Sequence, residues 1–206
     1  MSGRRRVRMT GQERREQLLD VGRALFAERG FEAASIEEIA QRAKITKPVI
    51  YEHFSGKEGL YAVIVDREVQ RLLGRITQAL DATHPRAKLE QAAEAFLAYI
   101  EEEQDGFRIL VRDSPVASSS GTLASLIGDM ASQVEYIFVD EFKTRDYNPK
   151  LAPLYSQALV GMVALVGQWW LDVKKPSREQ VAAHLVNLAW NGLSDLETNP
   201  RLSEST

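Results

Sequence analysis

Residues 43–61 read AKITKPVIYEHFSGKEGLY and place a proline where a helix is about to begin. Pro48 follows Thr46 and Lys47, so it falls in the first turn of a helix that starts near residue 47. In that turn the N–H that proline lacks would have no intrahelical partner, and Thr46 is suited to cap the helix. The proline therefore predicts a helix start and not a helix break.

A second short helix is predicted immediately before this one. The sequence SIEE, from Ser35 to Glu38, fits a capping box, and the predicted helices 35–43 and 47–54 are separated only by a tight turn. Two short helices with this spacing and a compact apolar set are typical of a helix-turn-helix unit. The apolar set comprises Ile36, Ile39, Ala40, Ala43, Ile45, Ile50 and Phe54.

The open side of the helix at 47–54 carries side chains that suit duplex DNA. A recognition helix presents its first residues to base edges, where Lys47 could donate to guanine and Val49 could touch a thymine methyl. Tyr51, His53 and Lys57 suit contacts to phosphates. The predicted DNA-contacting residues of this unit are Ser35, Thr46, Lys47, Pro48, Val49, Tyr51, His53 and Lys57. Taken singly, each has an alternative reading as helix punctuation, packing or a solvated charge.

Charge is unevenly distributed along the chain. Residues 1–60 carry a net charge of +3 and residues 61–206 one of −6, and a basic segment on an acidic body is typical of nucleic-acid binding. The alternative is an ordinary charged face. The first residues form a basic arm with Arg4, Arg5 and Arg6, which we also predict to contact DNA. The arm would follow the backbone or enter the minor groove, and the alternative is simple disorder.

The segment Leu25 to Leu60 resembles the N-terminal domain of the tetracycline-repressor (TetR) family of bacterial transcription regulators. The resemblance rests on three motifs, F-x-x-x-G-F from Phe26, I-x-x-I-A-x-x-A from Ile36 and Y-x-H-F-x-x-K-x-x-L from Tyr51. It implies that the residues from Lys47 to Lys57 listed above meet operator DNA. Glu37 departs from the pattern, because some relatives carry a basic residue near that position.

The rest of the chain predicts further helices, so the expected fold class is all-α. We expect an N-terminal three-helix helix-turn-helix DNA-binding domain at residues 1–55 and a C-terminal helical bundle for ligand binding and dimerisation at 56–206. Periodicity and capping patterns, including those at Thr10, Ser55 and Ser177, place the helices. The predicted ranges are 10–29, 35–43, 47–54, 56–82, 86–104, 106–112, 121–144, 152–174 and 178–195.

The last two predicted helices are apolar over most of their circumference, which indicates burial. We expect them to pair with their copies in a second subunit as a four-helix interface, as the resemblance also implies, and the alternative is an ordinary core within one chain. The predicted interface residues are Tyr155, Leu159, Met162, Val166, Trp169, Trp170, Leu185, Leu188 and Trp190.

The central helices carry an aromatic and aliphatic stripe. In relatives a small molecule binds in such a bundle, so the resemblance implies an effector pocket, and an apolar lining favours a hydrophobic effector. The alternative is plain core packing. The predicted lining is Phe96, Tyr99, Phe107, Leu110, Val111, Leu126, Met130, Val134 and Phe138.

Several classes of protein lack support in the sequence. There is no cysteine, no recognisable catalytic, zinc or phosphate-loop motif, and no run of about 18 apolar residues that would span a membrane. We expect no enzyme activity, cofactor or metal, and a cytoplasmic location. The predicted function is a homodimeric, ligand-responsive DNA-binding regulator, most simply a repressor released by its effector. The alternatives are a helical interaction module and an uncharacterised enzyme.

Overall fold

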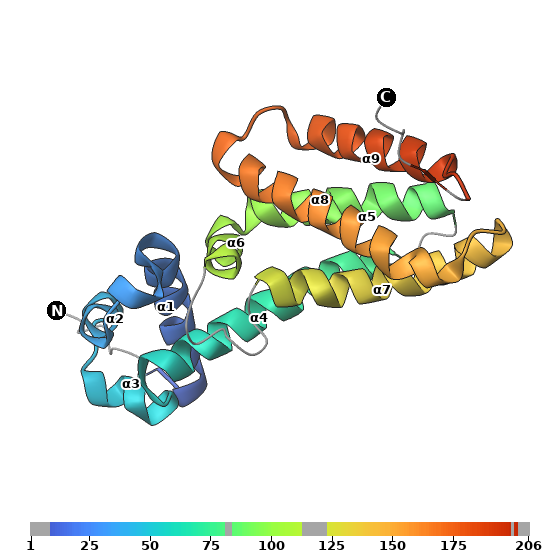
Figure 1. The fold of residues 1–206 in the computed structure, drawn as a ribbon. Helices are drawn as coiled ribbons and strands as arrows, with labels where there is room; N and C mark the ends of the chain where they lie inside the picture. Colours follow the sequence, from blue (N-terminus) through green and yellow to red (C-terminus); the bar gives the residue numbers. More distant parts are fainter. Residues whose placement is uncertain (1–8, 81–83, 113–122, 199, 202–206) are drawn as a thin grey trace. The chain divides into compact units, whose positions relative to one another are not determined.

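The computed structural model describes residues 9–80, 84–112, 123–198 and 200–201, and side chains from residue 127 onward in the segment that begins at 123. Within these residues the secondary structure is helical, with no strand (Figure 1). The helices are α1 (Gly11–Ala33), α2 (Ile36–Ala43), α3 (Lys47–His53), α4 (Gly56–Ala79), α5 (Pro85–Glu102), α6 (Gln104–Val111), α7 (Leu123–Thr144), η2 (Pro149–Leu151), α8 (Ala152–Val173) and α9 (Arg178–Ser194). The all-α prediction is confirmed.

The chain divides into two compact units. The N-terminal unit comprises Met1–Val69 and Asp105–Thr122, and the C-terminal unit comprises Gln70–Gln104 and Leu123–Thr206. Helix α4 therefore runs from one unit into the other. Helix α6 packs with the N-terminal helices, although a boundary drawn along the sequence at residue 55 would assign it to the bundle.

Side-chain caps fix several helix starts. Thr10 and Glu13 form a complete capping box, with Thr10 N–H donating to the Glu13 carboxylate at 2.7 Å, and Ser177 forms another with Gln180. The Ser35 hydroxyl accepts from Glu38 N–H at 3.2 Å, but the Glu38 carboxylate pairs with arginines instead of reaching back. These bonds satisfy amide groups that a helix start leaves without partners.

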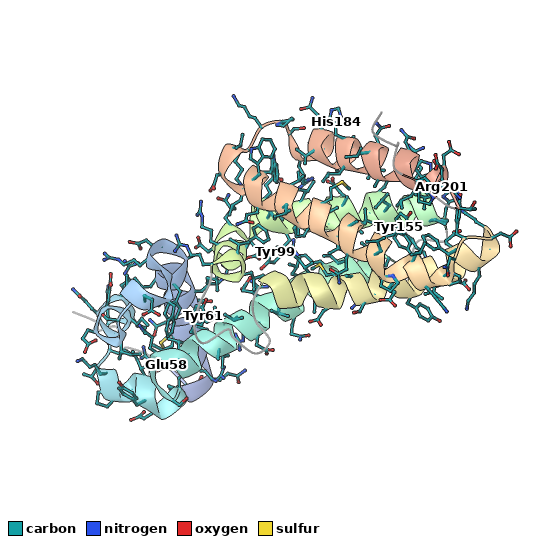
Figure 2. All side chains as sticks on the ribbon, viewed as in Figure 1. Glu58, Tyr61, Tyr99, Tyr155, His184 and Arg201 are labelled. Carbon is teal, nitrogen blue, oxygen red and sulfur yellow. The ribbon has the colours of Figure 1, made fainter. Side chains whose placement is uncertain are left out.

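Gly30 interrupts α1 and does not end it. Its φ of +79° and ψ of 170° break the helical path, and one more turn follows to Ala33. Phe31, in this turn, is buried with its ring 4.9 Å from that of Tyr61, which Figure 2 labels. The predicted helix end near residue 29 coincides with the break at Gly30. The sequence did not predict the turn that follows, which burial of Phe31 stabilises.

The turn between α2 and α3 has the geometry of a Schellman motif. Lys44 adopts φ +55°, and Ile45 N–H donates to the Ala40 carbonyl at 3.0 Å. Ile39 on α2 and Ile50 on α3 are fully buried, so the two helices share one core. This arrangement confirms the predicted helix-turn-helix fold.

Helix α6 is fastened to the N-terminal unit by polar contacts. Arg112 donates from Nη1 to the carbonyl oxygen of Ala27 at 2.8 Å, and Gly106 lies against the buried carboxylate of Glu68. Glu68 in turn accepts from Arg23 Nε at 3.0 Å. The side chains of Phe107 and Leu110 are fully buried in this unit.

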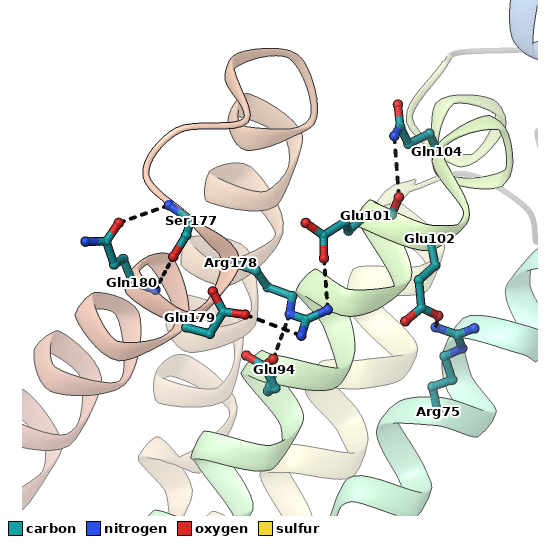
Figure 3. Close-up of polar contacts among 9 residues, drawn as sticks. All are labelled: Arg75, Glu94, Glu101, Glu102, Gln104, Ser177, Arg178, Glu179 and Gln180. Carbon is teal, nitrogen blue, oxygen red and sulfur yellow. Dashed lines mark hydrogen bonds and ion pairs between the residues drawn. The ribbon is translucent and has the colours of Figure 1, made fainter.

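The C-terminal unit is a bundle of α5, α7, α8 and α9. At the start of α9, Arg178 pairs with Glu94 at 2.7 Å and Glu101 at 2.9 Å, both on α5 (Figure 3). Gly167 on α8 lets that helix approach α5, because an added Cβ would lie 2.4 Å from the Phe96 ring. Tyr99, labelled in Figure 2, is fully buried.

Candidate DNA interface and internal cavity

Helix α3 presents a largely uncovered face. Lys47, Pro48 and Glu52 are exposed, Tyr51 is 59% exposed, and only Ile50 in this helix is buried. Val49 and His53 are half-buried. Thr46 occupies the N-cap position with extended backbone angles, but its hydroxyl forms no capping bond, contrary to the prediction. That exposed hydroxyl is available to an external acceptor such as a phosphate.

Lys47 is held by a neighbouring carboxylate. Its ammonium forms an ion pair with Glu37, in the first turn of α2, and both side chains are more than half exposed. The hydrogen bond from Lys47 keeps the pKa of Glu37 below its ordinary value. Glu37 therefore places a retained negative charge beside the surface predicted to meet DNA.

Lys57 points back into its own unit. Its ammonium donates to the carbonyl oxygen of Phe31 at 3.0 Å and lies 4.3 Å from the centre of the Phe31 ring. A cation at the C-terminal end of a helix interacts favourably with the helix dipole. In this structure the Lys57 ammonium caps the last carbonyl groups of α1. A phosphate that contacted Lys57 would have to compete with these carbonyls for its N–H groups. Ser35, half-buried, serves as the N-cap of α2.

The basic arm, with Arg4, Arg5 and Arg6, lies outside the described residues, so its predicted contact with DNA stays a prediction.

The C-terminal unit contains a partly open, almost entirely apolar cavity of about 160 Å³. Its walls come from the end of α4 and from α5, α7, α8 and α9. Four residues predicted to line a pocket do so, namely Phe96, Met130, Val134 and Phe138. Sequence reasoning missed other lining residues, among them Ala93, Ile137, Leu159, Val163 and the polar Lys88, Glu141 and Arg145.

Four other predicted lining residues lie elsewhere. Phe107, Leu110 and Val111 belong to α6, which packs in the N-terminal unit, and Tyr99 is buried without facing the cavity. Their apolar character reflects core packing, the alternative left open by the sequence. Leu126 lies in α7, but its side chain is outside the described ones.

The residues predicted to form a dimer interface divide into four groups. Trp170 and Leu185 are buried within the chain, and the Trp170 indole N–H donates to the Pro176 carbonyl at 2.8 Å. Leu159 and Trp190 line the cavity. Tyr155, Met162 and Val166 are half-buried, whereas Trp169 and Leu188 are 52% and 63% exposed.

An exposed apolar face nevertheless runs along α8 and α9. Leu154, Leu165 and Trp169 recur at helical spacing on α8, and each is at least half exposed. Leu188 is the corresponding large apolar residue on α9, one turn from His184, which Figure 2 labels on that helix. Pairing of this face with a second copy stays a prediction.

Two family models together match most of the chain. Residues 18–64 match the family model described as bacterial regulatory proteins, tetR family, and residues 75–203 match a tetracyclin repressor-like C-terminal domain. The second match alone covers more than half of the chain. The chain belongs to the TetR family of bacterial transcription regulators. It is thereby a DNA-binding regulator with a ligand-binding C-terminal domain.

Full-length TetR-family relatives support this assignment. The chain is 32% identical over 193 residues to the HTH-type transcriptional activator FasR of Mycolicibacterium smegmatis, which covers 93% of this chain and 88% of the relative. It is 28% identical over 181 residues to the HTH-type transcriptional repressor BepR of Brucella suis, covering 83% and 87% of the two chains. A TetR-like regulator from Rhodococcus sp. RHA1 superposes with a TM-score of 0.76 at 26% identity, over 91% of this chain and 99% of that one.

TetR-family membership also bears on the apolar character of α8. The segment Pro149–Val173 is long and apolar enough to cross a membrane by length and composition alone. In this fold one side of α8 lines the cavity and the other forms the exposed face described above.

Among the described residues, no three histidine, aspartate or glutamate side chains gather where they could hold a metal ion.

Proposed function

We propose that this protein is a homodimeric repressor that binds operator DNA through α3 and is released by a small apolar effector held in the C-terminal cavity. The observation that carries the proposal is the uncovered face of α3, on which Lys47 and Tyr51 project from a helix-turn-helix whose core is complete without them. A buried helix would instead turn such side chains inward. No catalysis is part of this role, and the protein acts in the cytoplasm.

Dimerisation supplies the geometry that operator binding needs. Two recognition helices reach successive major grooves when they lie about 34–36 Å apart. The exposed apolar face on α8 and α9 supports pairing, because burying Leu165, Trp169 and Leu188 against a copy removes large apolar surface from water.

The effector acts through its preference for one of two states. A ligand shifts DNA affinity only by the difference between its affinities for the DNA-competent and the released conformations. Because α4 continues from the helix-turn-helix unit into the wall of the cavity, a change at its C-terminal half is carried by one helix into the N-terminal unit.

Activation is the second candidate. It is favoured by the similarity to FasR, a relative named an activator that matches almost the whole chain, whereas BepR is named a repressor. Transcription in vitro distinguishes repression from activation, with a template that carries the operator found by random-site selection. A repressor lowers the transcript yield as protein is added, and an activator raises it.

Selection from a random duplex library tests the proposal. The wild-type protein is expected to enrich a palindromic motif with half-sites about one helical turn apart, and the Lys47→Ala/Tyr51→Ala protein is expected to enrich none while remaining dimeric by sedimentation. Enrichment of the same motif by both proteins would exclude α3 as the reading element. An absence of any motif for both would exclude operator binding.

A further inference from the structure

The cavity is apolar inside but polar at one end. The start of α5, the end of α7 and the end of α9 lie together at one end of the C-terminal unit (Figure 1). They contribute Lys88 from α5, Glu141 and Arg145 from α7, and Ser194 from α9, and Tyr147 follows α7 closely. Gln133, also in the lining, accepts a hydrogen bond from Thr77.

Lys88 is a cation at this rim for which the described part of the chain shows no ion-pair partner. Its side chain is half-buried against the cavity, and no carboxylate within the described ranges forms an ion pair with it. The neighbouring Arg86, by contrast, pairs with Glu90 at 2.9 Å. Partial burial of an unpaired ammonium is unfavourable, so an anion bound beside it would be stabilised.

Arg145 adds a second cation whose pairing is incomplete. It contacts Glu141 through Nε at 3.3 Å, which leaves its two terminal nitrogens without a partner among the described residues. Glu141 offsets one of the two positive charges, so the rim carries a net charge of about +1 from Lys88, Arg145 and Glu141. Tyr147 and Ser194 provide neutral hydroxyl groups.

The apolar part of the cavity limits the size of the rest of the ligand. The volume of the whole cavity, rim included, is about 160 Å³, close to the ~150 Å³ of an engineered apolar cavity that binds benzene and below the ~300 Å³ of typical drug-sized sites. Phe96, Val134 and Val163 line this part. A short hydrocarbon chain fits these walls better than a large polar metabolite.

We infer that the cavity binds an apolar anion, with a short hydrocarbon body between α5, α7 and α8 and one anionic head group at Lys88 and Arg145. This inference rests on the proposed function, because it names the chemical class of the effector. The anionic head group distinguishes this effector from a neutral apolar ligand, which would gain no charge-assisted contact from Lys88 and Arg145.

Calorimetry on the full-length protein tests the inference with three probes of equal chain length, all below their aggregation concentrations. Octanoate is expected to bind about tenfold more tightly than octan-1-ol and more tightly still than octylammonium, because one charge-assisted contact is worth about that factor. Affinity is expected to rise about fourfold per methylene from butanoate until the cavity is full.

A matched pair of variants locates the head group. Lys88→Gln is expected to remove most of the preference for octanoate over octan-1-ol, whereas Lys143→Gln, which removes an exposed cation of α7 outside the cavity lining, is expected to leave it unchanged. Equal binding of octanoate and octan-1-ol by the wild type, or equal loss in both variants, would overturn the assignment.

Binding of the wild type to its selected operator, measured in the same preparation without any probe, separates the two proposals. If the operator is bound but none of the three probes binds, the inference about the effector fails and the regulator function stands. If octanoate binds as expected but no operator is found, the cavity assignment holds and the regulator function fails.

Discussion

Lys47, the first residue of α3, forms an ion pair with Glu37 in the first turn of α2. The first cation of α3, the helix proposed to read DNA, is therefore paired with a carboxylate of the other helix of the motif. If Lys47 contacts DNA as proposed, binding has to exchange this pair for a contact to a base or phosphate, and Glu37 would then face the duplex with its negative charge.

Glu37→Gln is expected to raise the affinity for duplex DNA about threefold at 0.1 M salt, since it frees Lys47 and removes a charge that repels phosphates. Fluorescence anisotropy measures the change. Glu90→Gln, which removes an exposed carboxylate of the C-terminal unit, is the matched control and should leave the affinity unaltered. Lower affinity of Glu37→Gln would show that the carboxylate helps to read the operator.

The melting temperature should fall in acid because protonation of Glu16 in the N-terminal unit removes its charged contact with Arg67. Arg67 donates to Glu16 at 2.6 and 2.8 Å, and this bond lowers the Glu16 pKa. A lowered pKa contributes stability that is complete above the unfolded value of about 4.3 and is lost as the pH falls through the folded value. The melting temperature of Glu16→Gln should therefore lie below that of the wild type at pH 7, and the difference should shrink as the pH falls below the unfolded value of about 4.3. A constant difference across this range would contradict the assignment.

Gly106 permits the close packing of α6. A Cβ there would lie 1.9 Å from Oε2 of the buried Glu68, so Gly106→Ala should lower the free energy of unfolding by about 1–3 kcal/mol. At Gly128 on α7 an added Cβ would meet no atom within 4 Å beyond its own helix backbone, so Gly128→Ala should raise the free energy of unfolding by up to about 1 kcal/mol. Urea unfolding measures both changes. Equal effects of the two substitutions would argue against the close contact at α6.

The apolar face of α8 and α9 should hold the dimer. Leu188→Glu introduces a charge into the proposed contact and is expected to give monomers at micromolar concentration in sedimentation. Tyr136, on α7, is 82% exposed, and Tyr136→Glu is the control that should leave the mass unchanged. A dimeric Leu188→Glu protein would place the interface elsewhere.

Local signals in the sequence sufficed for the helix-turn-helix. Pro48 predicts the start of α3, and capping by Thr10 predicts the start of α1, because these effects depend only on residues within one turn. Ser177 predicts the start of α9 in the C-terminal unit in the same way. Gly30 illustrates the limit. Its positive φ breaks α1, but only burial of Phe31 beside Tyr61 decides that the chain resumes a helical turn.

The cavity was harder to predict, since an apolar period shows that a face is buried and not which helix buries it. Phe107 and Phe96 look alike in sequence, yet one packs in the N-terminal unit and the other lines the cavity. Lys88 and Arg145 carry no local signal, because they are separated by more than fifty residues and meet only through the packing of the bundle.

The most direct test of the central claim is fluorescence anisotropy of the purified protein on duplex DNA from upstream of its own gene, against a scrambled duplex, across a salt series. TetR-family regulation through α3 predicts tight binding to the first duplex that is at least a hundredfold stronger than to the second and weakens steeply with salt. Lys47→Ala should lose that preference. Equal, weak binding of the wild type to both duplexes, and to operators from random-site selection, would contradict the account.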